Sequence, residues 1–156
     1  MIKIGHGFDS HKFQDGEFII LGGIKIPSKR AIVAHSDGDI LIHALCDALL
    51  GALGKGDLGM FFDSSKRFKD ICSLHLLSEV IKILDAEGYK IINIDATVIT
   101  ETPRISKYAQ EIEKSISKFL KINEEQVNVK SKSNDNLGYI GRMEGIESHV
   151  VILIEK

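Results

Sequence analysis

The stretch DILIHALCDALLGAL, residues 39–53, decides the fold. Apolar residues recur in it at intervals of three and four, the spacing that places side chains on one side of an α-helix. They form a wide apolar face made of Ile40, Leu41, Ala44, Leu45, Ala48, Leu49 and Ala52. The stretch therefore predicts a helix that packs against the core.

Two apolar segments on the N-terminal side of this helix predict strands. The first covers residues 2–13, and the second covers residues 18–26 with Gly22 and Gly23 in its middle. Residues 27–30 then begin a polar connection to the helix.

The C-terminal side alternates between helical and β patterns. Residues 70–87 keep helical spacing, and Gly88 suits the position after the last turn. Residues 91–100 are β-rich, and one parity of this segment is expected to face the core: Ile92, Ile94, Ala96 and Val98.

A third amphipathic helix is expected after this strand. Thr102 and Pro103 suit its N-cap and its first turn, and its apolar positions reach Phe119. Residues 127–133 and 149–154 then predict two further strands, separated by a glycine-bearing loop.

The order of these elements is ββ-α-α-β-α-β-β, which favours a single mixed β-sheet with helices packed on one face. The fold class is α+β rather than doubly wound, because strands and helices do not alternate strictly. A length of 156 residues is usual for one domain, so residues 1–156 are expected to form a single domain.

Composition excludes several classes of function. A net charge of −2 and a pI near 6.3 argue against non-specific binding of nucleic acid or membrane surfaces. No apolar run approaches transmembrane length, and the N-terminus shows no signal region. Cys46 and Cys72 form no C-x-x-C pattern and suggest no disulfide framework. We expect a cytoplasmic bacterial protein, or one of an organelle stroma or matrix after removal of a targeting segment.

The segment GHGFDSH, residues 5–11, carries the first candidate ligands. Side chains two residues apart share one face of a strand, so Asp9 and His11 are expected to point the same way. Gly5 and Gly7 on that face are expected to leave open space. His6 points to the opposite face, where a core or interface histidine is the expected role.

His43 is the third candidate ligand. It lies in a polar stripe with Asp39 and Asp47 at four-residue spacing on an otherwise apolar helix. This stripe is either a solvated helix edge, or one of the carboxylates orients the imidazole of His43. Asp, His and His suit zinc, and three protein ligands with one open position are typical of a catalytic site.

Two polar segments are candidates for binding phosphate. KSKSND, residues 130–135, supplies lysines and hydroxyls where a strand enters a loop, and Asp135 could hold a hard cation such as magnesium. HSDGD, residues 35–39, precedes the helix and could equally serve as its N-cap and turn. Lysines at a strand end are also common on plain solvated surface.

Together these segments resemble the 2-C-methyl-D-erythritol 2,4-cyclodiphosphate synthase family over essentially the whole chain. The strings that carry the resemblance are GHGFDSH at 5–11, AHSDGD at 34–39, HALCDALLGA at 43–52, GDLG at 56–59, VNVKSKSNDNLG at 127–138 and GRMEG at 141–145.

The resemblance implies a site with two metals. Asp9, His11 and His43 would bind zinc, and Asp135, where the family usually has glutamate, would bind magnesium or manganese. His35 and Ser133 would be the catalytic residues, with Ser133 at the family's threonine position. The residues that would contact substrate are Asp9, His11, His35, Ser36, Asp57, Gly59, Phe62, Asp63, Thr100, Pro103, Arg104, Ile105, Ser106, Lys132, Ser133, Asn134, Asp135, Tyr139 and Arg142. One residue of the family is missing between Phe62 and Asp63.

The resemblance also implies a homotrimer with active sites between subunits. Phe8, Tyr139, Arg142 and Glu144 would then face a central cavity, which could hold an isoprenoid diphosphate. Phe8 and Asp9 lie on opposite faces of one strand, which agrees with one face carrying the metal and the other the interface.

The implied reaction converts 4-diphosphocytidyl-2-C-methyl-D-erythritol 2-phosphate to the 2,4-cyclodiphosphate with release of CMP. The enzyme would be a phosphorus–oxygen lyase of non-mevalonate isoprenoid biosynthesis. Three alternatives start from the same residues: a metal-dependent phosphohydrolase on a nucleotide-linked substrate, a non-catalytic trimeric protein that binds a nucleotide or metal, and a polar surface without function.

Overall fold

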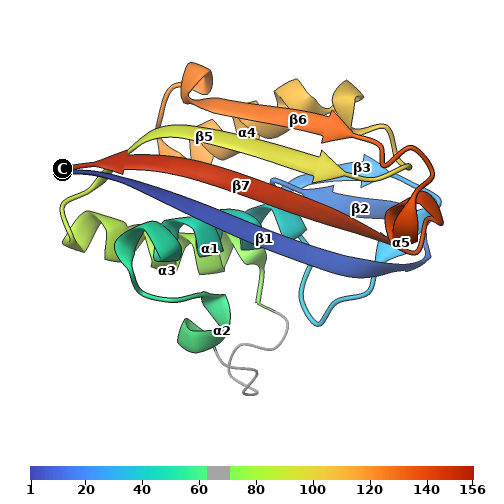
Figure 1. Cartoon of the computed structure of the whole chain (residues 1–156), viewed down its shortest axis with the longest axis horizontal. Coiled ribbons are helices and arrows are strands. Elements are labelled where there is room, and N and C mark those ends of the chain that lie inside the picture. Colours follow the sequence, from blue (N-terminus) through green and yellow to red (C-terminus); the bar gives the residue numbers. More distant parts are fainter. Residues whose placement is uncertain (63–70) are drawn as a thin grey trace.

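In the computed structural model, which describes residues 1–62 and 71–156, five strands form a curled mixed sheet (Figure 1). The strand order is β4-β1-β7-β5-β6, and only β5 and β6 pair in parallel. These strands are β1 (Ile2–Asp15), β4 (Arg30–Ile32), β5 (Lys90–Ile99), β6 (Val127–Lys132) and β7 (Gly145–Glu155). The α+β class is confirmed, and the last strand begins four residues earlier than residue 149.

Helices cover one face of this sheet, as the sequence predicts (Figure 1). Helix α1 lies against β1 and β7, α3 packs on α1, and α4 lies against β6. The other face leaves Ile4, Phe8 and Val151 exposed. The helical elements are α1 (Ile40–Leu53), α2 (Leu58–Phe61), α3 (Ser73–Ala86), η1 (Ile105–Lys107), α4 (Ala109–Leu120), η2 (Glu124–Gln126) and α5 (Gly138–Gly141).

A β-hairpin replaces the second predicted strand. β2 (Phe18–Leu21) and β3 (Ile24–Pro27) pair with each other in a separate two-stranded sheet, so the prediction of a single sheet was wrong. Gly22 and Gly23 form the turn with φ of 58° and 77°, values that favour glycine at both central positions. Consecutive glycines were therefore a hairpin signal.

Glycines let helix α1 approach β1 very closely. A Cβ atom on Gly5 would lie 1.8 Å from the carbonyl oxygen of Ala48, and one on Gly7 would lie 1.8 Å from that of Ala44. The expectation of open space beside these glycines was wrong, because the helix backbone fills it. The close approach brings His43 on α1 over the strand that carries Asp9.

Two local features differ from the sequence prediction after α3. A β-bulge at Ile91–Asn93 shifts the parity of β5, so that Ile91 is buried in place of Ile92. Thr102 is no N-cap, since η1 begins only at Ile105 and α4 only at Ala109. A turn and the short η1 helix occupy the interval.

Helix α3 begins at Ser73 instead of residue 70, and residues 63–70 lie outside the described part of the chain. The short helices α2 and α5 were not predicted, because four-residue helices carry too few positions for a period to be visible. In the described ranges, the structure contains no helix with both the length and the apolarity needed to cross a bilayer.

Candidate metal centre and substrate site

Asp9, His11 and His43 meet at the edge where α1 crosses β1. Oδ2 of Asp9 lies 3.0 Å from Nδ1 of His43 and 3.3 Å from Nε2 of His11. Alternation along β1 places Asp9 and His11 on the same face, and the glycine-packed helix supplies His43. Across residues 1–62 and 71–156, this is the sole group of three or more His, Cys, Asp or Glu side chains whose ligand atoms lie within 4.8 Å of one another.

The charges of these groups are coupled. Burial would raise the pKa of Asp9, but hydrogen bonds to His11 and His43 and the charges of both imidazoles outweigh it and lower the pKa to about 2. Burial would lower the pKa of His43, but the hydrogen bond and charge of Asp9 outweigh it and raise that pKa. The site therefore keeps the carboxylate of Asp9 ionised between two imidazoles, and this negative charge attracts a cation.

The donor set fits a divalent metal ion. Ligand bonds of about 2.0–2.1 Å in tetrahedral geometry place neighbouring donor atoms roughly 3.4 Å apart. The 3.0 Å and 3.3 Å separations around Asp9 are close to this value. One carboxylate oxygen and two imidazole nitrogens suit zinc, and three protein ligands leave a fourth position for substrate.

The second nitrogen of His43 contacts a residue that the sequence did not single out. Nε2 of His43 lies 2.9 Å from the hydroxyl of Ser73, the first residue of α3. Nothing in the local spacing of Ser73 marks it, because the helix that carries it begins 30 residues after His43. Only tertiary packing brings the two together.

The carboxylates of the predicted polar stripe have other partners. Asp39 is buried and accepts backbone N–H groups from Gly22, Gly23 and Ile42, so it caps α1 and holds the hairpin turn. Burial raises its pKa to about 6 although these three donors lower it. Asp47 accepts the backbone N–H of Leu58 at 2.8 Å. Asp39 and Asp47 thus accept hydrogen bonds from backbone N–H groups, whereas the imidazole of His43 lies within hydrogen-bond distance of Asp9 and Ser73.

A hollow of about 350 Å³ opens beside the three candidate ligands. Its wall includes four further residues of the predicted substrate site, namely His35, Ser36, Gly59 and Phe62. Asp57 caps α2 by accepting the N–H of Met60 at 3.0 Å, which fixes the turn that carries Gly59. Asp63 lies outside the described residues.

The remaining predicted residues gather where β5 and β6 end. The backbone N–H of Thr100 donates to the carbonyl of Lys132 at 3.0 Å, which places residues 100–106 beside residues 132–135. Arg104, Ser106 and the whole of residues 132–135 are exposed. Ile105 is fully buried and can offer a ligand only its backbone.

Glu101 organises this second group and was missed by the sequence prediction. Its Oε1 accepts the backbone N–H groups of Asn134 at 2.9 Å and of Asn136 at 3.1 Å. These bonds hold Asp135 and Asn136 in the left-handed region, with φ of 52° and 59°. The carboxylate of Asp135 is thereby placed on a defined, exposed turn.

The two groups lie at opposite edges of the sheet within one chain, because among the described residues β4 pairs only with residues 13–15 and leaves the outer side of β1 unpaired at Asp9 (Figure 1). Asp9 pairs with Ser148, Ser148 with Val98, and Val98 with Ser131. This row crosses three strand spacings, or roughly 14 Å, with the core packed against its inner face. The chain therefore brings the metal ligands together with His35 and Ser36, but does not bring Ser133 to them.

The open face of the sheet carries the residues predicted for a central cavity. Phe8 is exposed there, Tyr139 donates to Glu147, and Arg142 pairs with Glu144 at 2.9 Å. His6 is also exposed, with Nε2 3.3 Å from Nδ1 of His149, so it is no core histidine of this chain. An interface role for His6 stays a prediction.

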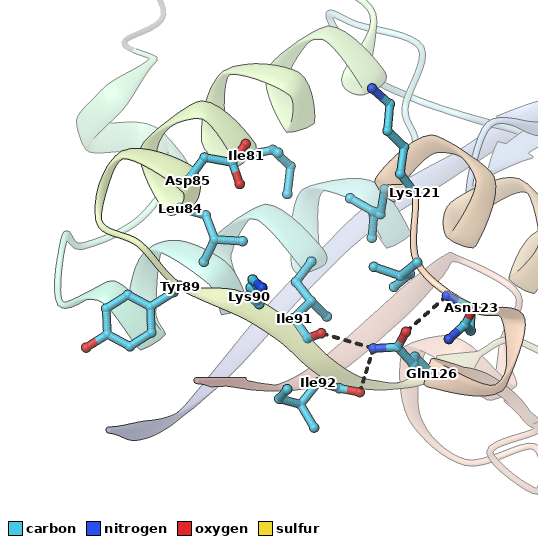
Figure 2. Close-up of a pocket in the computed structure, with 12 residues that line it drawn as sticks. Ile81, Leu84, Asp85, Tyr89, Lys90, Ile91, Ile92, Lys121, Asn123 and Gln126 are labelled. Atoms are coloured by element: carbon cyan, nitrogen blue, oxygen red, sulfur yellow. Dashed lines mark hydrogen bonds between the residues drawn. The ribbon is translucent and has the colours of Figure 1, made fainter. Parts of the chain in front are cut away.

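A second hollow of about 390 Å³ lies far from the candidate ligands, between the ends of α3 and α4 and the start of β5 (Figure 2). Gln126 spans its floor, donating to the carbonyls of Ile91 and Ile92 at the bulge and accepting from Asn123. No residue of the predicted site lines it. The hydrogen bonds of Gln126 in this hollow hold the bulge of β5. Although the hollow is as large as the one beside Asp9, its lining offers no group of metal ligands among the described residues.

The model of the YgbB family matches residues 2–155. The chain is 48% identical over 155 residues to a 2-C-methyl-D-erythritol 2,4-cyclodiphosphate synthase of Caldicellulosiruptor bescii, covering 99% of both chains. It is 44% identical over 156 residues to the enzyme of the same name from Syntrophomonas wolfei, again covering 99% of both.

Solved structures share the fold. The CDP complex of IspF from Plasmodium falciparum is 38% identical with a TM-score of 0.87, over 98% of this chain and 95% of that one. The bifunctional IspDF from Campylobacter jejuni is 35% identical with a TM-score of 0.94, and the match covers 99% of this chain but 42% of that longer one.

Proposed function

The chain belongs to the YgbB family, and from this premise we propose that the hollow beside Asp9, His11 and His43 is where it forms a cyclic diphosphate. Its function is that of a 2-C-methyl-D-erythritol 2,4-cyclodiphosphate synthase in isoprenoid biosynthesis. The observation that carries the assignment of the site is the convergence of three metal-type ligands with His35 and Ser36 in one hollow.

The proposed substrate is 4-diphosphocytidyl-2-C-methyl-D-erythritol 2-phosphate. An oxygen of its 2-phosphate attacks the β-phosphorus, the bond from that phosphorus to the oxygen of CMP breaks, and CMP leaves with the bond's electron pair. The attacking oxygen is already an anion, so no strong base is required. The enzyme must instead align several negative charges, which is a task of positioning and charge neutralisation.

Asp9, His11 and His43 would hold zinc, which when bound supplies Lewis-acid stabilisation of the charge on the reacting phosphates. His35 and Ser36 line the hollow at the entrance to α1 and would donate hydrogen bonds to the methylerythritol phosphate. Asp57 and Gly59 would bind its hydroxyl groups. Phe62 and Leu76 contribute apolar side chains to the wall of the hollow.

Residues 100–106 and 132–135 would bind the cytidine diphosphate end. Lys132 and Ser133 are exposed and free to donate to phosphate oxygens, and Asn134 lies on the same turn. Asp135 supplies one carboxylate on that turn, which fits magnesium because this ion commonly combines one or two carboxylates with substrate phosphates. The CDP complex of the Plasmodium falciparum relative supports a cytidine nucleotide as ligand.

A homotrimer would join the two groups. The triad and Ser133 lie at opposite edges of one sheet, and an apolar strip of β1 and β7 that includes Ile4, Phe8 and Val151 is exposed. Packing copies of the chain side by side would bury this strip and bring the triad of one copy to Ser133 of the next. The central space beside Tyr139 and Arg142 would then be available to an isoprenoid diphosphate.

A product assay tests the function. The purified chain is incubated with the proposed substrate, zinc and magnesium, and the products are identified by mass spectrometry. We expect cyclic diphosphate and CMP in equal amounts, in line with classification as a phosphorus–oxygen lyase. Release of free phosphate without cyclic product would instead support the phosphohydrolase, and nucleotide binding without turnover would support a binding protein.

A further inference from the structure

Ser73 connects His43 to a carboxylate on the loop before α1. Its hydroxyl oxygen lies 2.9 Å from Nε2 of His43 and donates a hydrogen bond to Oδ1 of Asp37. Ser73 is fully buried, so water does not compete for its hydroxyl. Two segments remote in sequence, residues 37–43 and the start of α3, therefore meet in one hydrogen-bonded chain, Asp37–Ser73–His43.

Asp37 is itself held by the start of α3. Its Oδ2 accepts the backbone N–H of Ser73 at 2.9 Å, and its Oδ1 also accepts that of Asp39 at 3.2 Å. Cys72, at the N-cap position of α3, makes no side-chain capping bond, so the carboxylate of Asp37 takes this role from outside the helix. The contact that anchors α3 thus also fixes the hydroxyl of Ser73.

The direction of the hydrogen bonds follows from the available protons. A serine hydroxyl carries one proton, and an ionised carboxylate can only accept. Because the proton of Ser73 goes to Asp37, its oxygen presents a lone pair to His43. Nε2 of His43 must then carry a proton, and Nδ1, which lies 3.0 Å from Oδ2 of Asp9, is the nitrogen left to bind a metal.

We propose that Asp37 and Ser73 are positioning residues that hold His43 with its proton on Nε2 and its Nδ1 directed at the metal. The inference rests on the proposed function, since it needs a metal at Asp9, His11 and His43. Neither residue lines the hollow, and the hydroxyl of Ser73 reaches the metal site through His43. Partners of this kind fix the ring orientation and the tautomer of a ligating histidine, and their loss commonly weakens metal binding by about 10- to 100-fold.

The test compares two buried serines. Ser73→Ala removes the hydroxyl and leaves the backbone N–H that Asp37 accepts. Ser117→Ala is the matched control, because Ser117 is buried in α4 and its hydroxyl donates to the carbonyl of Lys114 at 3.1 Å. We expect the zinc dissociation constant, measured by competition with a chelator, to rise about 10- to 100-fold in Ser73→Ala and to stay unchanged in Ser117→Ala.

A second readout reports the tautomer directly. Nitrogen-15 NMR of the zinc-loaded chain, with labelled histidine, identifies which nitrogen of His43 carries the proton. In the wild type we expect zinc on Nδ1 and a proton on Nε2 that exchanges slowly with water. In Ser73→Ala we expect faster exchange of that proton. Asp37→Asn should shift both readouts in the same direction, since an amide offers one acceptor fewer.

The outcomes separate the inference from the function on which it rests. Zinc bound through Nε2 of His43, or an unchanged dissociation constant in Ser73→Ala, would overturn the positioning role while leaving the metal site intact. Failure of the wild-type chain to bind zinc would overturn both. A loss of melting temperature shared by Ser73→Ala and Ser117→Ala, with no difference in zinc affinity, would show a purely structural role.

Discussion

The edge at β1 and the edge at β6 are built in different ways. At the β1 edge Asp9 and His43 are 23% and 15% exposed, and each has fixed hydrogen-bond partners. At the β6 edge Ser133 and Asp135 are exposed on a turn that backbone hydrogen bonds hold in place. A metal requires ligands fixed within a fraction of an ångström, whereas a nucleotide can be bound by backbone groups of loops. The difference suits the rigid edge to holding zinc and the open edge to binding the cytidine diphosphate end and its magnesium.

The largest effect is expected at the rigid edge. His43→Ala removes one of three ligands, and loss of Lewis-acid stabilisation worth several kcal/mol should lower kcat by about 1,000-fold or more. Zinc retention should be lost, while circular dichroism should show the fold intact. His75→Ala, an exposed histidine on α3, is the control and should behave as wild type. Full activity of a metal-free His43→Ala chain would remove His43 from the site.

The rigidity of this edge can be attacked without touching a ligand. A Cβ on Gly7 would lie 1.8 Å from the carbonyl oxygen of Ala44, so Gly7→Ala must push α1 away from β1. We expect the free energy of unfolding to fall by about 3 kcal/mol, together with weaker zinc binding. Gly51→Ala on the same helix is the control, because its nearest neighbour would be the carbonyl oxygen of His6 at 3.9 Å. Denaturant unfolding measures the free energy of unfolding of both variants. Equal values for Gly7→Ala and Gly51→Ala would show that stability does not depend on the close approach of α1 to β1.

At the open edge a smaller and different effect is expected. Ser133→Ala should lower kcat by about 10- to 1,000-fold, as for the loss of one preorganised donor. Zinc affinity should not change, because Ser133 is not one of the three candidate ligands. Steady-state kinetics and a chelator titration measure the two quantities. Ser78→Ala on α3 serves as the control, and a rate equal to wild type in Ser133→Ala would place Ser133 outside the site.

The smallest effect concerns pH and the metal-free chain. The pKa of Asp9 is lowered from 3.8 to about 2, so its contribution to stability is present above pH 3.8 and is lost as the pH falls towards 2. The pKa of His43 is raised above 6.5, so its contribution is present below pH 6.5 and is lost as the pH rises through that raised value. Between pH 3.8 and pH 6.5 the two groups together should add on the order of 1 kcal/mol to the free energy of unfolding, after allowance for solvent screening.

Zinc should reverse the loss of stability at high pH, because it binds the deprotonated nitrogen of His43 and the proton no longer competes there. Melting temperatures recorded from about pH 2 to pH 8 should therefore show a gain from zinc that grows as the pH rises. The same series on Asp9→Asn should lack the metal-free optimum. A zinc effect independent of pH would contradict the coupling of Asp9 with His43.

Strand and helix periodicity predicted much of the fold. The face of α1 and the parity of Asp9 and His11 were correct, since each depends only on local repeats. The hairpin at Gly22 and Gly23 was missed, because two apolar strands joined by a two-residue turn look like one interrupted strand. The bulge in β5 was missed too, since it depends on the carboxamide of Gln126 more than 30 residues later.

The candidate site, like the fold, was predicted where the evidence was local in the sequence and missed where it depended on tertiary contacts. The ligand types and their spacing pointed to Asp9, His11 and His43, and the structure brings the three together. Ser73 and Glu101 escaped, because each acts through a tertiary hydrogen bond that leaves no period in the sequence. Asp39 and Asp47 were considered as partners of His43 because they share its helical face. In the structure they instead accept backbone N–H groups of other segments.

Subunit complementation tests most directly whether the two edges meet between copies of the chain. His43→Ala lacks the metal edge, and the double variant Ser133→Ala with Asp135→Ala lacks the other, so each alone should be nearly inactive. In co-assembled mixtures, random pairing should restore intact sites at about one interface in four, and with them about a quarter of wild-type formation of cyclic diphosphate. Activity no higher than the mean of the two separate variants would show that both edges act within one chain, and would contradict the account.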